Sequence, residues 1–152
     1  MPDITVGTNS YVSVADADEY MASRLYADAW GSADATDKAK AIMMATRAID
    51  RLLLAGRPAD TEQELAFPRD GQDDVPQAVV DATCEEALAI LDRGNSERRR
   101  MQADGLTSFQ IGTLSEVYAT GQSGRSLVPH GLISVEAREL MRAYTAGSVA
   151  IR

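Results

Sequence analysis

The chain has 152 residues, enough for one domain with a single hydrophobic core, and we take residues 1–152 as that domain. Hydrophobic residues make up 45% and charged residues 25%, as in ordinary globular proteins, but aromatic residues only 5%. Fifteen basic and 23 acidic residues give a net charge of −8, which disfavours binding to nucleic acids and anionic membranes, because both attract Lys and Arg. Without an apolar run of 18 residues or a leader pattern, we expect no membrane span and no secretory signal.

The N-terminal part predicts an extended arm and a short helix. Residues 1–12 mix Pro, Gly and Asn with strand-forming residues, which is typical of an extended segment. Ser13 and Asp16 then form a capping pattern at the start of a helix of about three turns. The spacing of apolar residues places Leu25 on the apolar face of this helix, and we expect Gly31–Ser32 to break the helix.

A second helix follows, and after it an irregular link. Asp34 or Thr36 caps this helix. Apolar residues at three- and four-residue spacing indicate that it continues to about Leu54, and Gly56 stands where a C-terminal glycine is expected. Residues 57–75 show no period, and an irregular link of this length is uncommon in a compact domain unless it has a function or is disordered. An apolar island from Leu65 to Pro68 predicts that the middle of the link is pinned to the body.

Pro76 suits the first turn of a third helix, which we expect to end near Gly94. Cys84 could be a nucleophile, but it falls on the apolar stripe of this helix, which favours a core position. Glu85 and Glu86 could be paired carboxylates for acid–base chemistry. Because adjacent helix residues point in different directions, we interpret them as part of a solvated face.

The C-terminal third predicts the β element and the last helix. Residues 106–118 alternate apolar and polar positions, as a strand does, and residues 121–131 indicate a glycine-rich loop that contains His130. Ser134 caps a final helix to about Tyr144. The predicted fold is therefore mainly α: a small bundle of about four helices with one short β element and extended loops and termini.

Candidate chemistry is sparse. The single His130 has no catalytic serine motif around it, and one His with one Cys excludes the usual zinc patterns. Asp70–Asp74 faintly resembles a calcium loop but lacks its closing glutamate, which favours a solvated turn. There is no glycine-rich phosphate loop. We therefore expect no enzyme, no cofactor and no metal site.

A short basic cluster combines Arg93 with Arg98, Arg99 and Arg100. These residues could contact phosphates or an acidic protein surface. We favour the alternative, a solvated segment just past a helix end, where positive charge is favourable. Aromatic residues are not interleaved with the arginines, so a stacking platform for single strands is not predicted at this place.

Four segments, in this order, resemble a phage and prophage family over about residues 7–120. They are Asn9–Tyr20, Ala45–Asp50, Leu65–Arg69 and Val75–Val79. The family is often labelled a DnaT-like single-strand DNA-binding protein. The genomic neighbourhood and the fold of this family resemble those of the head–tail connector, or adaptor, proteins of tailed phages.

The resemblance implies a structural virion protein at the head–tail junction, assembled in the host cytoplasm. Copies would form an oligomeric ring, typically dodecameric, that docks beneath the portal protein and joins the head to the next neck or tail completion protein. The isolated subunit could be a monomer. Genomic double-stranded DNA would pass through the ring without tight binding. The alternative function is a single-stranded DNA-binding module.

The net charge and the low aromatic content favour one of these two functions over the other. Tight single-strand binding needs a basic groove with exposed aromatics, whereas a channel wall should repel DNA, so an acidic and aromatic-poor chain favours the connector. We expect subunit or portal contacts from residues 1–12, from the link 57–75 and from the segment that begins at Tyr144. Phe67 could instead be an intramolecular plug. Aromatic and Arg residues dominate interface energies, so the interface candidates are Tyr11, Phe67, Arg69, Arg98, Arg99, Arg100 and Tyr144.

Overall fold

The computed structural model describes residues 2–103 and 131–146, the side chains of 94–103 excepted. This part of the chain is mainly helical, which confirms the predicted class. Its elements are α1 (Val14–Ala22), α2 (Asp28–Ser32), α3 (Ala35–Asp50), α4 (Gln77–Ala103), α6 (Val135–Met141) and the 3₁₀ helix η2 (Arg142–Tyr144).

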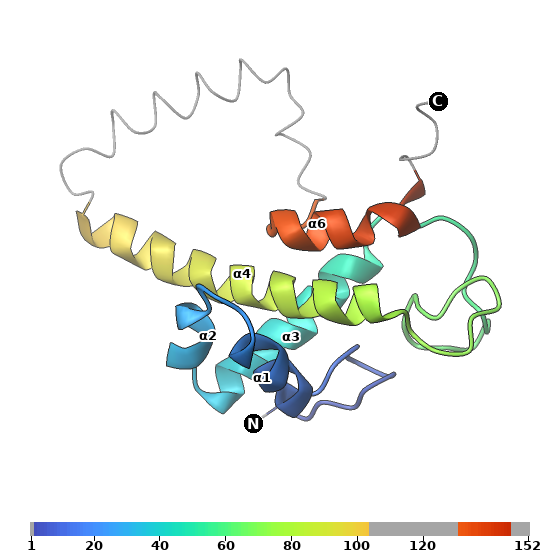
Figure 1. The fold of residues 1–152 in the computed structure, drawn as a ribbon, viewed down its shortest axis with the longest axis horizontal. Coiled ribbons are helices and arrows are strands. Elements are labelled where there is room, and N and C mark those ends of the chain that lie inside the picture. The colour runs from blue at the N-terminus through green and yellow to red at the C-terminus, as the bar shows by residue number, and fades with distance from the viewer. Residues whose placement is uncertain (1, 104–130, 147–152) are drawn as a thin grey trace, which may run out of the picture.

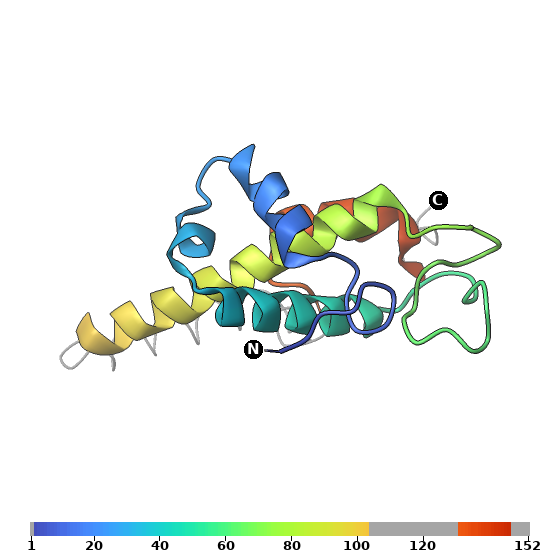
Figure 2. The same cartoon turned by 90° about the horizontal axis from the view of Figure 1, so that it is seen from below.

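Helix α4 is the axis around which the other elements pack. Helix α3 lies across it, α6 runs along its N-terminal half, and α1 and α2 cover the remaining side (Figures 1 and 2). Residues 82–88 of α4 are all buried. Seven successive residues make nearly two full turns of an α-helix, so α4 is enclosed on every face there. Its C-terminal end extends beyond the other described helices (Figures 1 and 2).

Two apolar clusters fill the space around α4. One joins α1, α2, α3 and α4 around Trp30, Ile42 and Leu88. The other joins the N-terminal arm, the end of α3, the link 57–75 and α6; its buried members include Ile49 and Phe67. The island in the middle of the link is thus pinned to the body, as predicted.

Three helices begin with the caps that the sequence predicted. The side chains of Ser13, Asp34 and Ser134 accept hydrogen bonds from backbone amides three residues further on, at 3.1, 2.8 and 3.1 Å. Each bond satisfies one of the amide groups that a helix leaves without an internal partner in its first turn. Asp34, and not Thr36, caps α3.

The predicted boundaries around α1 and α2 were wrong. Helix α1 ends at Ala22, and Leu25 is 76% exposed instead of facing the core. Tyr26 has a φ angle of 60°, a left-handed conformation that a continuing helix cannot contain. Gly31–Ser32 do not break a helix, because they form the end of α2.

Helix α3 ends at Asp50 and not near Leu54 as predicted. The backbone beyond it bonds to the C-terminal segment instead: the Ala55 amide donates to the Tyr144 carbonyl at 2.8 Å, and the Ala146 amide to the Leu53 carbonyl at 2.7 Å. Gly56, with φ +79°, is therefore not the glycine that ends this helix. A Cβ atom there would lie 2.0 Å from the Asp70 carboxylate, so the position needs glycine for close approach.

Helix α4 runs well past its predicted end at Gly94, to Ala103. A glycine within a helix costs only about 1 kcal/mol, and the residues after it include good helix formers. Arg98–Arg100 therefore belong to the helix and not to a polar segment after it. The predicted strand at 106–118, His130 and all of the predicted loop 121–131 except its last residue lie outside the described residues.

The prediction of a solvated face for Glu85 and Glu86 was wrong, since both residues are buried. Glu86, 2% exposed, accepts hydrogen bonds from the amides of Ile133 and Ser134, both at 2.9 Å. These amides lie just before α6, where the helix dipole also favours a carboxylate. Glu86 thereby fixes the start of α6 against α4.

We predict that Glu86→Ala lowers the free energy of unfolding by about 2–4 kcal/mol, because it leaves the buried amide of Ser134 and the partly buried amide of Ile133 without an acceptor. Urea unfolding followed by circular dichroism measures this change. Glu139→Ala is the control, since the Glu139 side chain is 64% exposed and its ion pair with Arg142 lies at the surface. Equal stability losses in the two variants would contradict the assigned role.

Candidate functional site

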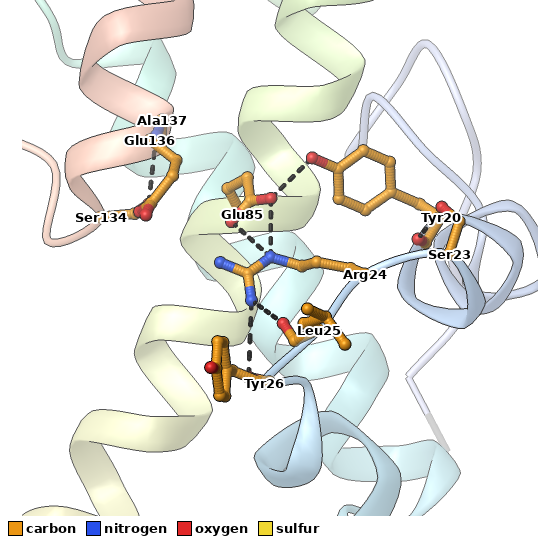
Figure 3. A network of polar contacts seen from close by, with 9 residues as sticks. All are labelled: Tyr20, Ser23, Arg24, Leu25, Tyr26, Glu85, Ser134, Glu136 and Ala137. Atoms are coloured by element: carbon orange, nitrogen blue, oxygen red, sulfur yellow. Dashed lines mark hydrogen bonds and ion pairs between the residues drawn. The ribbon is translucent and has the colours of Figure 1, made fainter.

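A groove lies between α2, α4 and the start of α6. Its volume is about 900 Å³. On its floor the Nε atom of Arg24 donates to both carboxylate oxygens of Glu85, at 2.8 and 3.0 Å (Figure 3). The hydroxyl of Tyr20 donates to Glu85 as well, at 2.6 Å. The buried carboxylate of Glu85 is thus held by an ion pair with Arg24 and by the phenol of Tyr20, which come from α1 and the turn that follows it.

Arg24 also holds the turn that leaves α1. Its Nη1 atom donates to the carbonyl of Leu25 at 2.6 Å and to that of Tyr26 at 3.4 Å (Figure 3). The turn leaves the side chain of Tyr26 88% exposed at the mouth of the groove. The hydrogen bond to Glu85 raises the pKa of Arg24, and burial raises the pKa of Tyr20, so both groups stay protonated at neutral pH.

The described lining of the groove carries four carboxylates and two guanidinium groups. Hydrogen bonds from its own backbone amide and from Ser134 lower the pKa of Glu136, which keeps this carboxylate ionised. The net negative field disfavours a phosphate in the groove and favours a cationic or polar partner. The charged lining residues are Arg24, Asp28, Glu85, Asp92, Arg93 and Glu136.

Four of the predicted interface residues come together in space, but within the subunit. The rings of Tyr11 and Phe67 meet edge to face at 6.1 Å between centroids, and those of Phe67 and Tyr144 at 5.5 Å. The guanidinium carbon of Arg69 lies 5.9 Å from the centre of the Phe67 ring. We call these four residues the aromatic junction, since they join the N-terminal arm, the link 57–75 and the C-terminal segment.

The buried position of Tyr11 and Phe67 corrects the expectation that they contact a neighbouring subunit. They are 3% and 2% exposed. The Tyr11 hydroxyl donates to Asp50 and accepts from the Phe67 amide at 3.1 Å. Burial raises the pKa of both Tyr11 and Asp50. Phe67 is the intramolecular plug that we gave as the alternative to an interface role for this residue.

Arg69 and the segment from Tyr144 are likewise tied to the body. Arg69 is partly buried and donates to the carbonyls of Ala55, Gly56 and Ala66 at 2.6–3.1 Å. Tyr144 is partly buried too, and its carbonyl accepts from the Ala55 amide. Both residues therefore have roles in holding the fold, whatever contacts they make outside it.

The remaining residues that the sequence analysis singled out lie in the core or at the C-terminal end of α4. Cys84 is 1% exposed in the core, as predicted, and burial raises its pKa to about 12, which keeps the thiol unreactive at neutral pH. Arg98–Arg100 lie in the part of α4 that extends beyond the other helices. No group of three His, Cys, Asp or Glu residues in the described chain could hold a metal ion.

Sequence reasoning missed the buried network of Arg24, Glu85 and Glu86. A signal for it was present: small residues flank the two glutamates on α4, at Ala82, Thr83 and Ala87. Small side chains on several faces of a helix allow neighbours to approach from all directions. Polar residues between them must then be buried with partners and cannot be solvated.

The structure thus defines a small helical protein with an acidic groove and a basic run on an extended helix. None of its described helices has the length and apolarity that crossing a membrane requires. A model of the family described as "Putative DnaT-like ssDNA binding protein" matches residues 2–151, and the chain belongs to this family. No curated protein and no solved structure matches the chain.

We predict that Tyr11→Phe lowers the free energy of unfolding by about 1–3 kcal/mol, because Asp50 loses a donor and the Phe67 amide loses its acceptor. Thermal or urea unfolding gives the value. Tyr26→Phe is the matched control, since it removes the same hydroxyl from a residue that is 88% exposed. A Tyr11 variant as stable as this control would contradict the role of the aromatic junction.

Proposed function

We propose that this protein binds single-stranded DNA through the arginine-bearing end of α4. Membership of a family described by single-strand DNA binding is the observation that carries the proposal. The structure removes part of the support for the connector function, because Tyr11 and Phe67, chosen as ring contacts, are buried within the subunit. The residues that would bind DNA, Arg98–Arg100, lie on a helix that extends from the body.

Binding of this kind is local and electrostatic. The net charge of −8 and the acidic groove repel a polynucleotide from most of the described surface. Three arginines on successive helical positions can each neutralise a phosphate. Affinity should therefore be modest, independent of base sequence and steeply dependent on salt.

The test is a titration of a fluorescent oligo-dT with the full chain at several salt concentrations. We predict that replacing Arg98, Arg99 and Arg100 by Ala weakens binding and reduces the slope of log K against log salt by about 2, since each phosphate contact on a single strand contributes about 0.7. Far-UV circular dichroism checks that α4 remains helical.

A matched control changes the net charge equally at another place. Arg47, Arg51 and Arg57 are exposed and lie in or after the last turn of α3. Replacing these three by Ala should leave the affinity and the salt slope nearly unchanged. No binding by the wild type at low salt, or equal losses in the two triple variants, would contradict the proposal.

A connector subunit is the second candidate function, and the charge balance is the observation that favours it. A channel wall should be acidic, so that DNA passes without being held. A helix end that extends past its packing partners is marginal in isolation and gains stability when other subunits cover it. In this proposal the chain docks beneath a portal protein, at the head–tail junction of a virion, as an oligomeric ring that also meets a neck or tail protein.

Light scattering after gel filtration tests the connector, with the protein alone and mixed with the portal protein encoded by the same phage. We predict co-elution at a mass that corresponds to many copies per portal, because head-to-tail contacts between subunits close into a ring of several copies. Failure to associate over a range of salt and protein concentrations would contradict the connector and leave single-strand binding as the function.

A further inference from the structure

The outer face of α3 carries a row of positive charge. Exposed residues recur there at spacings of four, three and four positions, which places them in one line along the helix. Asp37 pairs with the first of them at 4.0 Å, but Arg47 and Arg51 form no ion pair among the described residues. We call this row the basic stripe; its residues are Lys40, Met44, Arg47 and Arg51.

The groove between α2, α4 and α6 carries the opposite charge in excess. Asp28 and Asp92 line it, are exposed and form no ion pair in the part of the chain that the structure describes. The two cations of the lining are already engaged, Arg24 with Glu85 and Arg93 with another group of the chain. The groove therefore has carboxylates to offer to a cation from outside.

Apolar side chains accompany the charges on both surfaces. Met44, in the middle of the basic stripe, is 48% exposed. In the groove, Tyr26 and Val135 are 88% and 60% exposed. A methionine side chain is flexible and makes favourable contacts with aromatic rings, and a tyrosine is a frequent anchor of interfaces. The two surfaces thus match in charge and in apolar character.

One molecule cannot bring its own stripe and groove together. The buried residues of α3 lie on the side of the helix opposite the stripe, and α3 packs against α4 (Figures 1 and 2). The stripe therefore faces away from α4, whereas Glu85 and Leu88 of α4 line the groove. Only a second copy can place a basic stripe against this groove.

We propose that copies of this chain associate head to tail, with the basic stripe on α3 of one copy lying against the acidic groove of the next. Such a contact is heterologous, so association does not stop at two copies but continues into a ring or a filament. The proposal goes beyond single-strand binding. It supplies the contacts between subunits that a connector needs, but it does not depend on a portal protein.

Charge reversal on each surface tests the contact. The groove variant carries Asp28→Lys and Asp92→Lys, and the stripe variant carries Arg47→Glu and Arg51→Glu. Each variant alone should self-associate at least about tenfold more weakly than the wild type, because like charges then face each other. A mixture should form complexes, since the groove variant keeps its stripe and the stripe variant keeps its groove. Sedimentation velocity on the full chain, with one variant fluorescently labelled, measures both effects.

Controls separate the contact from effects on net charge and folding. The groove variant reduces the net charge of −8, which by itself eases association, so weaker association is specific to the surface. Asp73→Lys with Asp74→Lys makes the same change of charge in the exposed link before α4, and should associate at least as well as the wild type. Circular dichroism melting checks that each variant folds, and mixing does not rescue a misfolded chain.

The outcomes also separate this contact from the two proposed functions. The groove variant keeps Arg98–Arg100, so it should still bind oligo-dT, and the chain alone should self-associate whether or not it binds a portal protein. A wild type that stays monomeric at every concentration would overturn the contact and leave the groove to a basic segment of another protein. Single variants that associate normally, a mixture without complexes, or a wild type that stops at a dimer would overturn it as well.

Discussion

The enclosure of α4 on every face is the constraint on which the rest of the structure depends. Over residues 82–88 there is no solvated side, so Glu85 and Glu86 must satisfy their carboxylates within the protein. Glu85 draws in Arg24 and Tyr20, which fixes the turn after α1. Glu86 accepts from the amides before α6. Two adjacent charges thereby position elements from both ends of the chain.

The aromatic junction performs the corresponding task at the other end of the molecule. Phe67 lies between Tyr11 and Tyr144, and Arg69 closes the cluster with hydrogen bonds to backbone carbonyls. Segments without regular structure cannot satisfy their backbone in helices or sheets, so they need such anchors to stay ordered. The junction ties the arm, the link 57–75 and the C-terminal segment to one another and to the helical body.

Both proposed functions depend on how charge is distributed over this fold. The groove between α2, α4 and α6 is acidic, while the arginine run lies on a helix that leads away from it. A basic segment separated from an acidic body can bind a polyanion, a template protein or the acidic surface of another copy. The family description favours the first of these partners, and the net charge favours a role in which DNA is not held.

Local rules were enough to predict the helical class, the caps at Ser13, Asp34 and Ser134, and the core position of Cys84, because each depends on neighbours in the chain. The sequence by itself also determined the net charge and the basic cluster at Arg98–Arg100. Only the tertiary structure decided that Glu85 and Glu86 are buried, that Phe67 and Tyr11 face inward, and that α3 ends at Asp50. These depend on partners that lie between 39 and 65 residues away in the chain or in the C-terminal segment, and no local pattern specifies such partners.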